Sequence, residues 1–379
     1  AALLGSGMMP SSIPLGDLQR EYGRLHSKID AAIERVLRRG WFILGEEGEA
    51  FEAEWAAYCG AAHAVGVGNG TDAIHLGLRA AGIGPGDEVV VPALTAAFTA
   101  LAVSMAGAIP VFADIDPQRF TLAPAAFEAA ITQRTAAVIP VHLYGCPADM
   151  KPILEIARRH KLLVLEDAAQ AHGACYQERR VGGLADLAAF SFYPSKNLGA
   201  YGDAGAIVTD DTELAQRARA LRHGGQQGTY QHDLLGTNSR IDEIQAAILR
   251  TKLPHLNAWN LKRRALAARY DAGLAGFQDL ALPTVPGDVE HVYHQYVVRT
   301  HLRDTLRAYL DGARVKTGVH YPQAVHRQQA YAHLGYEQGS CPHAEKAASE
   351  ILSLPIFPQL TTHEAAQVIR LVRFFFAMR

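Results

Sequence analysis

The stretch FSFYPSKNLGAYGDAGAIV, residues 190–208, sets one lysine, Lys196, between two apolar runs. The runs at its two ends predict strands, and three glycines (Gly199, Gly202 and Gly205) let the backbone between them pass close to a bulky group. A lone lysine at the end of a strand is more often a solvated charge. This stretch alone leaves two interpretations of Lys196 open, a surface cation and a nucleophile.

Seven short apolar runs follow one another along the chain. They read AVGV, EVVVPA, IPVFAD, AAVIPVH, LLVLED, LAAFSF and AGAIVT, and helical patterns fit between most of them, for example over 71–81 and 150–160. Strands that are apolar on both faces and separated by helices predict a mainly parallel sheet between layers of helices. The expected fold class is therefore α/β.

The composition of the chain changes after a long predicted helix over 241–253, which Pro254 ends. Beyond it, a basic helix around 260–270 is followed by short strand-like segments such as HVYHQYVVRT. We therefore predict a large domain over residues 12–255 and a small C-terminal α+β domain over residues 256–379.

Overall composition favours small-molecule chemistry. The chain has 379 residues, 49% of them hydrophobic, and a net charge of −2, so neither a nucleic acid nor an anionic membrane is expected as a partner. The four cysteines form no CxxC pair and the 17 histidines form no HExxH motif, so we expect reduced thiols and no metal. The starting segment AALLGSGMMP does not resemble a secretory signal, and no apolar run is long enough to span a bilayer. A cytoplasmic location is expected.

Two further strand ends carry residues that are candidates for ligand binding or catalysis. In AVGVGNGTDAIHL a glycine turn follows a strand, and a helix begins at Gly70 and Thr71. The free N–H groups and positive end of such a helix suit a phosphate, although similar turns also serve only as helix caps. In LLVLEDAAQAHGA, Glu166 and Asp167 end an apolar strand, where a carboxylate is costly unless a cation meets it. A pyridinium nitrogen is one such cation, and capping of the next helix is the alternative role for Asp167.

A phosphate site, a buried carboxylate and a lysine are the parts that pyridoxal 5'-phosphate (PLP) requires of a protein. With these motifs the chain resembles the DegT/StrS family of PLP-dependent sugar aminotransferases, from about residue 12 to the C-terminus. The matching landmarks are GWFILGEEGEAFE, GVGNGTDAIHLGL, GDEVVVPALT, PVFADID, PVHLYG, EDAAQAHGA, FSFYPSKNLG and GTNSRIDEIQAAIL. The resemblance implies a fold type I PLP-dependent transferase that forms a homodimer with shared active sites.

The resemblance also implies a role for each residue of the site. It makes Lys196 the Schiff-base lysine and Asp167 the group that keeps the ring nitrogen protonated. It assigns the cofactor contacts to Gly70, Thr71, Asp167, Gln170, Ser191, Lys196 and Asn238, the last from the partner subunit. One departure concerns the ring face, because family members usually carry an aromatic residue after the threonine of VPALTAAFTA, where this chain has Ala96. Either Phe98 compensates or the ring is held less firmly.

The resemblance further implies transfer of an amino group from L-glutamate to a nucleotide-linked keto sugar. The segment FYPSKNLGAYGDAGA is similar to members that aminate C3, whereas members that aminate C4 typically have histidine at the position of Tyr193. The sequence thus predicts a dTDP-3-keto-6-deoxyhexose as acceptor and a 3-amino sugar as product. The alternatives are an aminotransferase for a C4 keto sugar or a keto-cyclitol, and a PLP-binding relative without transferase activity. Dehydratases of this group carry histidine where this chain has Lys196, which argues against them.

Candidate acceptor contacts come from two histidine- and tyrosine-rich segments, HVYHQY and GVHYPQAVH. By resemblance, His294, Tyr321 and His326 lie near the sugar nucleotide, with His291 and His320 beside them. Polar packing within the small domain is an equally good interpretation of each of these side chains.

Overall fold

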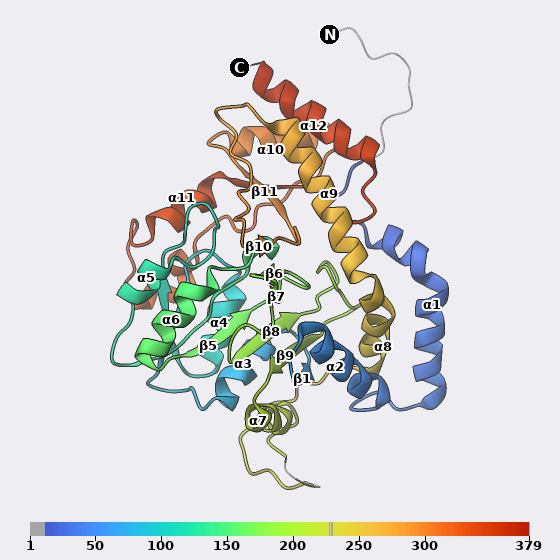
Figure 1. The fold of residues 1–379 in the computed structure, drawn as a ribbon, viewed down its shortest axis with the longest axis vertical. Helices are drawn as coiled ribbons and strands as arrows, with labels where there is room; N and C mark the ends of the chain where they lie inside the picture. Colours follow the sequence, from blue (N-terminus) through green and yellow to red (C-terminus); the bar gives the residue numbers. More distant parts are fainter. Residues whose placement is uncertain (1–11, 227, 229, 379) are drawn as a thin grey trace.

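The computed structural model describes residues 12–226, 228 and 230–378, so the starting segment AALLGSGMMP lies outside the described residues. At its centre is a seven-stranded sheet with the order β1-β9-β8-β5-β4-β2-β3 (Figure 1). The strands are β1 (His63–Val67), β2 (Glu88–Pro92), β3 (Ile109–Ala113), β4 (Thr135–Val138), β5 (Leu163–Asp167), β8 (Leu187–Ser191) and β9 (Gly205–Thr209). Each of them overlaps one of the seven apolar runs of the sequence.

The sheet is parallel except at one strand. The pairs β2–β3, β2–β4, β4–β5 and β5–β8 are parallel, whereas β9 is antiparallel to both β8 and β1. Residues 192–204, which join β8 to β9, contain no helix. A parallel neighbour would need a long crossover connection, so the chain turns back after the lysine segment. The prediction of an α/β fold with a mainly parallel sheet is confirmed.

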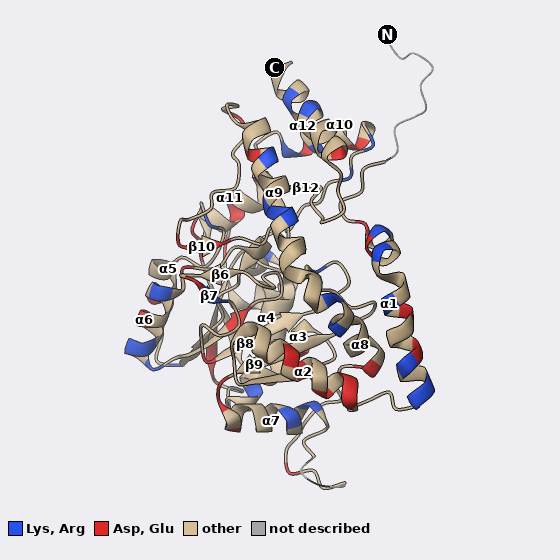
Figure 2. Cartoon of the chain, turned by 45° about the vertical axis from the view of Figure 1, so that its right-hand side comes forward, with Lys and Arg blue, Asp and Glu red and all other residues tan. Residues whose placement is uncertain are grey.

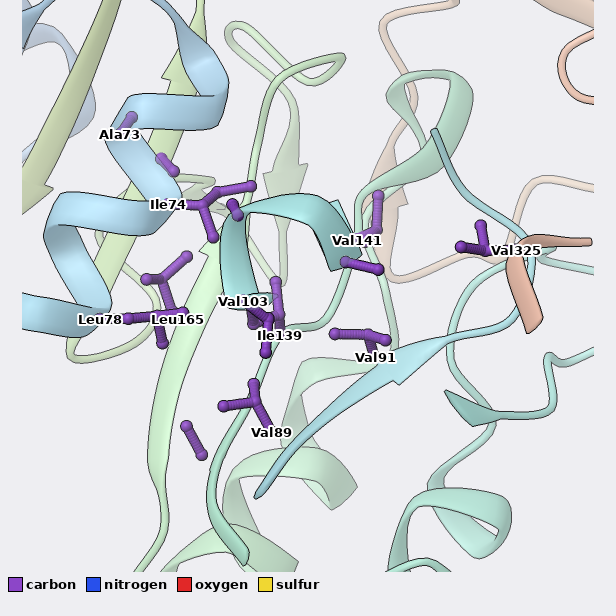
Figure 3. Packing of buried hydrophobic residues seen from close by; sticks show 14 of the residues in the cluster. Ala73, Ile74, Leu78, Val89, Val91, Val103, Ile139, Val141, Leu165 and Val325 are labelled. Carbon is purple, nitrogen blue, oxygen red and sulfur yellow. The ribbon is translucent and has the colours of Figure 1, made fainter. Parts of the chain in front are cut away.

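Both faces of the sheet are buried, and alternate residues of each strand belong to different cores. Val89 and Val91 of β2 pack in one hydrophobic cluster, and Val90 between them packs in the other. Figure 3 shows the first cluster, in which Ile74 and Leu78 lie against strand residues. This alternation follows from the period of two in a strand, and it decides which polar side chain at a strand end faces which layer.

Helices cover the two faces in two layers. The first cluster is covered by α3 (Gly70–Ala80), α4 (Ala97–Met105) and α7 (Thr212–Arg222). The second is covered by α2 (Glu46–Cys59), α5 (Pro124–Ala129), α6 (Met150–His160) and α8 (Glu243–Lys252), with α1 (Leu18–Arg39) packed outside α8. Helix α1 begins directly after Asp17, whose side chain caps it by accepting from the Arg20 N–H at 3.0 Å.

The C-terminal part contains a second group of elements, joined to the rest by the long helix α9 (Figure 1). These are α9 (Leu256–Leu274), β11 (Tyr296–Arg299), α10 (Arg303–Gly312), α11 (Pro342–Glu350), β12 (Ile351–Leu354) and α12 (Thr362–Ala377). Strands β11 and β12 are antiparallel, and a third hydrophobic cluster gathers around them. Helix α11 instead packs in the first cluster through Ala344 and Ala347. The division of the chain near residue 255 stays a prediction.

Minor elements complete the described structure. Strands β6 (Cys175–Tyr176), β7 (Arg179–Arg180) and β10 (Val289–Glu290) form a small sheet, and short 3-10 helices lie at Leu143–Gly145, Leu253–His255, Val325–Arg327 and Gln329–Leu334. Charged residues occur along outer helices such as α1, α6 and α7 (Figure 2). Within the described residues, no helix is long and apolar enough to cross a membrane, and no group of three or more metal-ligating side chains is found.

Candidate active site

The two adjacent carboxylates that end β5 face opposite layers. Asp167 is 5% exposed and lies on the side of α3 and α4, where its Oδ2 accepts a hydrogen bond from Thr99 Oγ1 at 2.7 Å. Its Oδ1 accepts from the Ala169 N–H at 3.2 Å. Thr99 lies in the first turn of α4 and is itself 3.2 Å from the hydroxyl of Thr95. One carboxylate is thus held by hydrogen bonds at the edge of the sheet where the parallel strands end.

Glu166 points to the other layer and is completely enclosed. Its Oε2 is 2.9 Å from His142 Nε2 and accepts from the Gly182 N–H at 3.1 Å, while its Oε1 accepts from the Leu184 N–H at 2.9 Å and the Ala185 N–H at 3.2 Å. The carboxylate therefore has protein donors on both oxygens and holds the loop before β8. Of the two acids in the sequence LLVLED, only Asp167 is available to a ligand.

Lys196 lies in the segment that joins β8 to β9, near enough to Asp167 for the charge of that carboxylate to act on its amine. Its backbone N–H donates to the Tyr193 carbonyl at 2.9 Å, which closes a turn. Burial lowers the pKa of the Lys196 amine to about 8, and the charge of Asp167 acts in the opposite direction. Among the described residues, the amine has no hydrogen-bond or ion-pair partner. A partly neutral amine without a partner can act as a nucleophile.

A narrow cradle forms where α3 begins. Asn69 caps this helix by accepting from the Asp72 N–H at 2.8 Å, and the N–H groups of Gly70 and Thr71 belong to the first turn, which has no intrahelical acceptors. A Cβ atom on Gly70 would lie 2.6 Å from the Cβ of Ser191, so only glycine permits this approach of α3 to the end of β8. Unpaired N–H groups and a nearby hydroxyl suit a phosphate.

Backbone contacts explain the glycines of the lysine segment. A Cβ on Gly205 would lie 2.4 Å from the carbonyl oxygen of Asn69, and one on Gly199 would lie 2.3 Å from that of Pro194. The first contact brings the end of the lysine segment against the cradle. The second folds the segment onto itself. Gly199 and Gly205 are therefore required by the tight path of the chain itself.

Gln170 connects the site to the C-terminal part. Its Oε1 accepts from the Tyr144 N–H at 2.6 Å, and its Nε2 donates to the Tyr321 hydroxyl at 3.2 Å. The Tyr144 hydroxyl in turn donates to the carbonyl of His320. Burial raises the pKa of Tyr321 to about 12, so its hydroxyl stays protonated at neutral pH. This network brings Tyr321 to the neighbourhood of Gln170 and Asp167.

The predicted acceptor histidines lie in different surroundings. His294 is 6% exposed, its Nδ1 is 3.2 Å from Asn197 Oδ1, and the charge of Lys196 contributes to lowering its pKa. His326 is 1% exposed and its Nε2 is 3.0 Å from Glu345 Oε1. His291 is also buried, with its Nδ1 accepting a backbone N–H. The structure thus brings His294 next to the lysine segment and gives His326 a protein partner of its own.

Two other predicted features lie on the surface of the chain. Asn238 is exposed, and its neighbour Ser239 accepts from the Gly68 N–H at 2.9 Å and donates to Asp72 at 2.6 Å. Phe98 is 62% exposed, beside the partly exposed Ala96. The partner contact of Asn238 and the stacking role of Phe98 stay predictions.

Sequence reasoning missed several residues that support the site. Thr99, which holds Asp167, stands four residues after Thr95 in VPALTAAFTA, a spacing that places both on one side of a helix entry. Asn197 directly follows Lys196, and this adjacency is a sequence feature that indicates a residue near the site. Asn260, whose Oδ1 accepts from Asn197 Nδ2 at 2.9 Å, and Tyr144 act through contacts between segments far apart in the chain, and nothing in the local sequence indicates them.

The residues at this edge fit PLP. The start of α3, where Gly70 leaves no room for a Cβ, suits the phosphate, and the buried Asp167 carboxylate held by Thr99 suits a protonated ring nitrogen. The Lys196 amine lies near enough to Asp167 for the carboxylate charge to act on it. The fold is that of a fold type I PLP-dependent aminotransferase, and these residues fit its cofactor.

Comparison with known proteins identifies the family within this class. The model of the DegT/DnrJ/EryC1/StrS aminotransferase family matches residues 24–373, and the chain belongs to that family. A transaminase of Streptomyces venezuelae, described as dTDP-3-amino-3,4,6-trideoxy-alpha-D-glucose transaminase, is 52% identical and covers 95% of both chains. The erythromycin biosynthesis sensory transduction protein EryC1 of Saccharopolyspora erythraea is 51% identical over 94% of this chain and 98% of its own.

A solved structure shows the same fold over nearly the whole chain. It is S. venezuelae DesV in complex with a ketimine intermediate, with a TM-score of 0.95 and 51% identity, covering 97% of this chain and 99% of that one. The prediction of a PLP-dependent aminotransferase of the DegT/StrS family is confirmed.

Proposed function

We propose that this aminotransferase moves an amino group from L-glutamate to C3 of a nucleotide-linked 3-keto-6-deoxyhexose, giving a 3-amino sugar. The observation that carries the proposal is the meeting of Lys196, the Asp167–Thr99 pair and the α3 cradle at one edge of the sheet. The 52% identity to a dTDP-3-amino sugar transaminase over 95% of both chains supports the C3 position and the nucleotide.

In this proposal each residue has a defined task. Bound PLP supplies the electron sink on which the carbon–hydrogen bond of the donor is weakened. Asp167, fixed by Thr99, holds a proton on the ring nitrogen, while Gly70, Thr71 and Ser191 bind the phosphate. Gln170, oriented by Tyr144, contacts the hydroxyl side of the ring.

Lys196 has a second task as an acid and base. A pKa of about 8 lies near the operating pH, so the amine can both accept a proton and return it. Glutamate and acceptor use the same site in turn, which requires that the amine reach the reacting carbon in both halves of the reaction.

We also propose that His294, Tyr321 and His326 contact the acceptor. Tyr321 is supported by its bond to Gln170, and His294 by its position beside the lysine segment. His326 rests on resemblance alone, since in this chain its ring faces Glu345.

The proposal includes a cytoplasmic homodimer built from a large domain, 12–255, and a small domain, 256–379, with Asn238 reaching the phosphate of the partner's site. Mixing inactive Lys196→Ala and Asn238→Ala subunits tests the sharing. A heterodimer with one intact site must be more active than either variant alone. No gain, with subunit exchange and a severe Asn238 defect both demonstrated, contradicts shared sites.

The substrate assignment is tested by competition between matched 3-keto and 4-keto sugar nucleotides with glutamate, scored by product mass. We expect preference for the 3-keto compound, and preference for the 4-keto compound or a keto-cyclitol overturns the C3 assignment. Failure to aminate any keto sugar while PLP is bound would favour a regulatory role, for which the name of the EryC1 relative is the motivation.

A further inference from the structure

Behind Lys196 lies a buried group of polar side chains from three segments. Asn197 follows the lysine, Asn260 lies on α9, and His294 precedes β11; they are 3%, 2% and 6% exposed. Buried polar groups in such a cluster must pair with each other in one consistent pattern. Here two backbone carbonyl groups that contact the cluster determine which atoms donate and which accept.

Two backbone carbonyls fix the orientation of both amides. The His172 carbonyl accepts from Asn260 Nδ2 at 2.8 Å, so Asn260 Oδ1 faces Asn197. The Val292 carbonyl accepts from Asn197 Nδ2 at 3.1 Å, and the same nitrogen donates to Asn260 Oδ1 at 2.9 Å. A carbonyl only accepts, so neither amide can be flipped without losing these bonds.

The orientation of Asn197 then decides the state of His294. Asn197 Oδ1 lies 3.2 Å from His294 Nδ1, and because an amide oxygen only accepts, Nδ1 must carry the proton. In a neutral ring this leaves Nε2 as an acceptor. Among the described residues Nε2 has no partner, and it is not one of the fully buried unpaired atoms, so it borders open space.

The charges around His294 favour the neutral ring. Burial is the main cause that lowers its pKa well below the usual value. The neighbouring groups that act on it are Lys196, Arg263, His172 and His320, and all of them lower the pKa further. Arg263, one turn after Asn260 on α9, donates to the carbonyls of Tyr293 and His294 at 3.0 and 3.4 Å. Its guanidinium group therefore keeps a positive charge close to His294.

We propose that Asn197 and Asn260 are positioning residues that hold His294 as the Nδ1–H tautomer, so that its Nε2 accepts a hydrogen bond from a hydroxyl group of the acceptor sugar. The inference rests on the proposed function and specifies it. The site selects acceptors that donate a hydrogen bond at this point, and an analogue whose hydroxyl is replaced by hydrogen or a methoxy group is bound less well.

Neutron diffraction of deuterium-exchanged holoenzyme crystals tests the tautomer without any substrate. Deuterium on His294 Nδ1 and none on Nε2 is the expected result. Deuterium on Nε2, alone or together with Nδ1, overturns the proposal, because Nε2 would then be a donor.

Kinetics test the contact. In His294→Asn the amide keeps a donor toward Asn197 but leaves nothing at the position of Nε2, so KM for the acceptor should rise about tenfold. His294→Gln can place an amide oxygen near that position and should lose less. The spectral change with glutamate alone is recorded for both variants as the reference, and the loss should be larger for the acceptor than for glutamate. An unchanged acceptor KM in His294→Asn overturns the contact, whereas loss of amination of every sugar by the wild type would instead overturn the proposed function.

Asn197→Asp tests the positioning role. A carboxylate beside Nδ1 stabilises the protonated ring, so the acidic limb of kcat/KM for the acceptor should move to higher pH, with activity recovering as pH rises. Only PLP-loaded dimer is scored, and Asn257→Asp, at an α9 residue bonded to Tyr58, is the matched control. A pH profile equal to that of the control overturns the positioning role.

Discussion

Two lysines of this chain are drawn in from solvent, and their surroundings differ in one respect. Lys252 is fully buried with its Nζ 2.6 Å from Glu21 Oε1, 2.7 Å from the carbonyl of Gly199 and 4.0 Å from the ring centre of Tyr201. Burial lowers its pKa and Glu21 raises it. A carboxylate, a carbonyl and an aromatic ring thus surround this ammonium group, so it is held as a structural cation.

Lys196 has the same opposing influences without the partners. Burial lowers its pKa and Asp167 raises it, yet the hydrogen bonds of Asp167 go to Thr99 and Ala169. The difference teaches that burial alone does not mark a reactive lysine. What distinguishes Lys196 is that the nearby carboxylate is occupied elsewhere. The two are also connected, since Lys252 binds the carbonyl of Gly199, three residues after Lys196.

The largest effect is expected from Lys196→Ala, which should abolish turnover while the chain still folds. Borohydride reduction of the wild type should remove its visible absorption and leave a covalent adduct on Lys196, found by peptide mass. An adduct on another lysine, with Lys196 unmodified in PLP-loaded protein, would sink the assignment.

Asp167→Asn should slow transamination by about a hundredfold or more, or ~2.7 kcal/mol of barrier, because an amide cannot hold the charge of the ring nitrogen. Glu166→Gln is the matched control on the opposite face of β5. It should lower stability by about 1–3 kcal/mol through its four hydrogen bonds and keep near-normal turnover per bound PLP. Equal losses of turnover in the two variants would contradict the division between the faces.

Lys252→Met tests whether the other buried lysine stabilises the fold without taking part in turnover. It leaves Glu21 without its cation, so the free energy of unfolding in urea should fall by about 3 kcal/mol, while turnover per bound PLP changes little. Adding Glu21→Gln should recover part of the loss. If the single variant is as stable as the wild type, Lys252 is not the structural cation described above.

The smallest effect concerns pH. With a Lys196 pKa of about 8 in place of the usual 10.5, the rate of PLP capture by the apoenzyme should rise with pH and level off above about 8. Because the folded pKa is lowered, the unfolded chain binds more protons between pH 8 and 10.5, so this group makes apoenzyme stability rise with pH there. A capture rate still rising at pH 10 would show an ordinary surface lysine.

The sequence alone predicts the sheet because each strand is an apolar run bounded by turns. It also singles out Lys196 and Asp167 as candidates, because residues at the ends of parallel strands meet at one edge, while their roles stay predictions that the family resemblance implies. The alternation within β5 separates Glu166 from Asp167 once the strand end is known.

What the sequence does not predict is the direction of side chains that meet across distant segments. The bond from Thr99 to Asp167, the bond from Asn260 to Asn197 and the pairing of His326 with Glu345 all depend on packing between elements. Residue type and spacing carry no information on such contacts.

The pairing of β1 with β9 has a consequence for how the chain folds. Val67 pairs with Gly205, and the cradle at Gly70 follows the first of these strands while Lys196 precedes the second. The two halves of the site thus come together only when two strands far apart in the chain pair with each other. Folding is slow in proteins that are rich in such distant contacts. Capture of PLP therefore reports that this closure is complete, and the bound cofactor then opposes reopening by mass action.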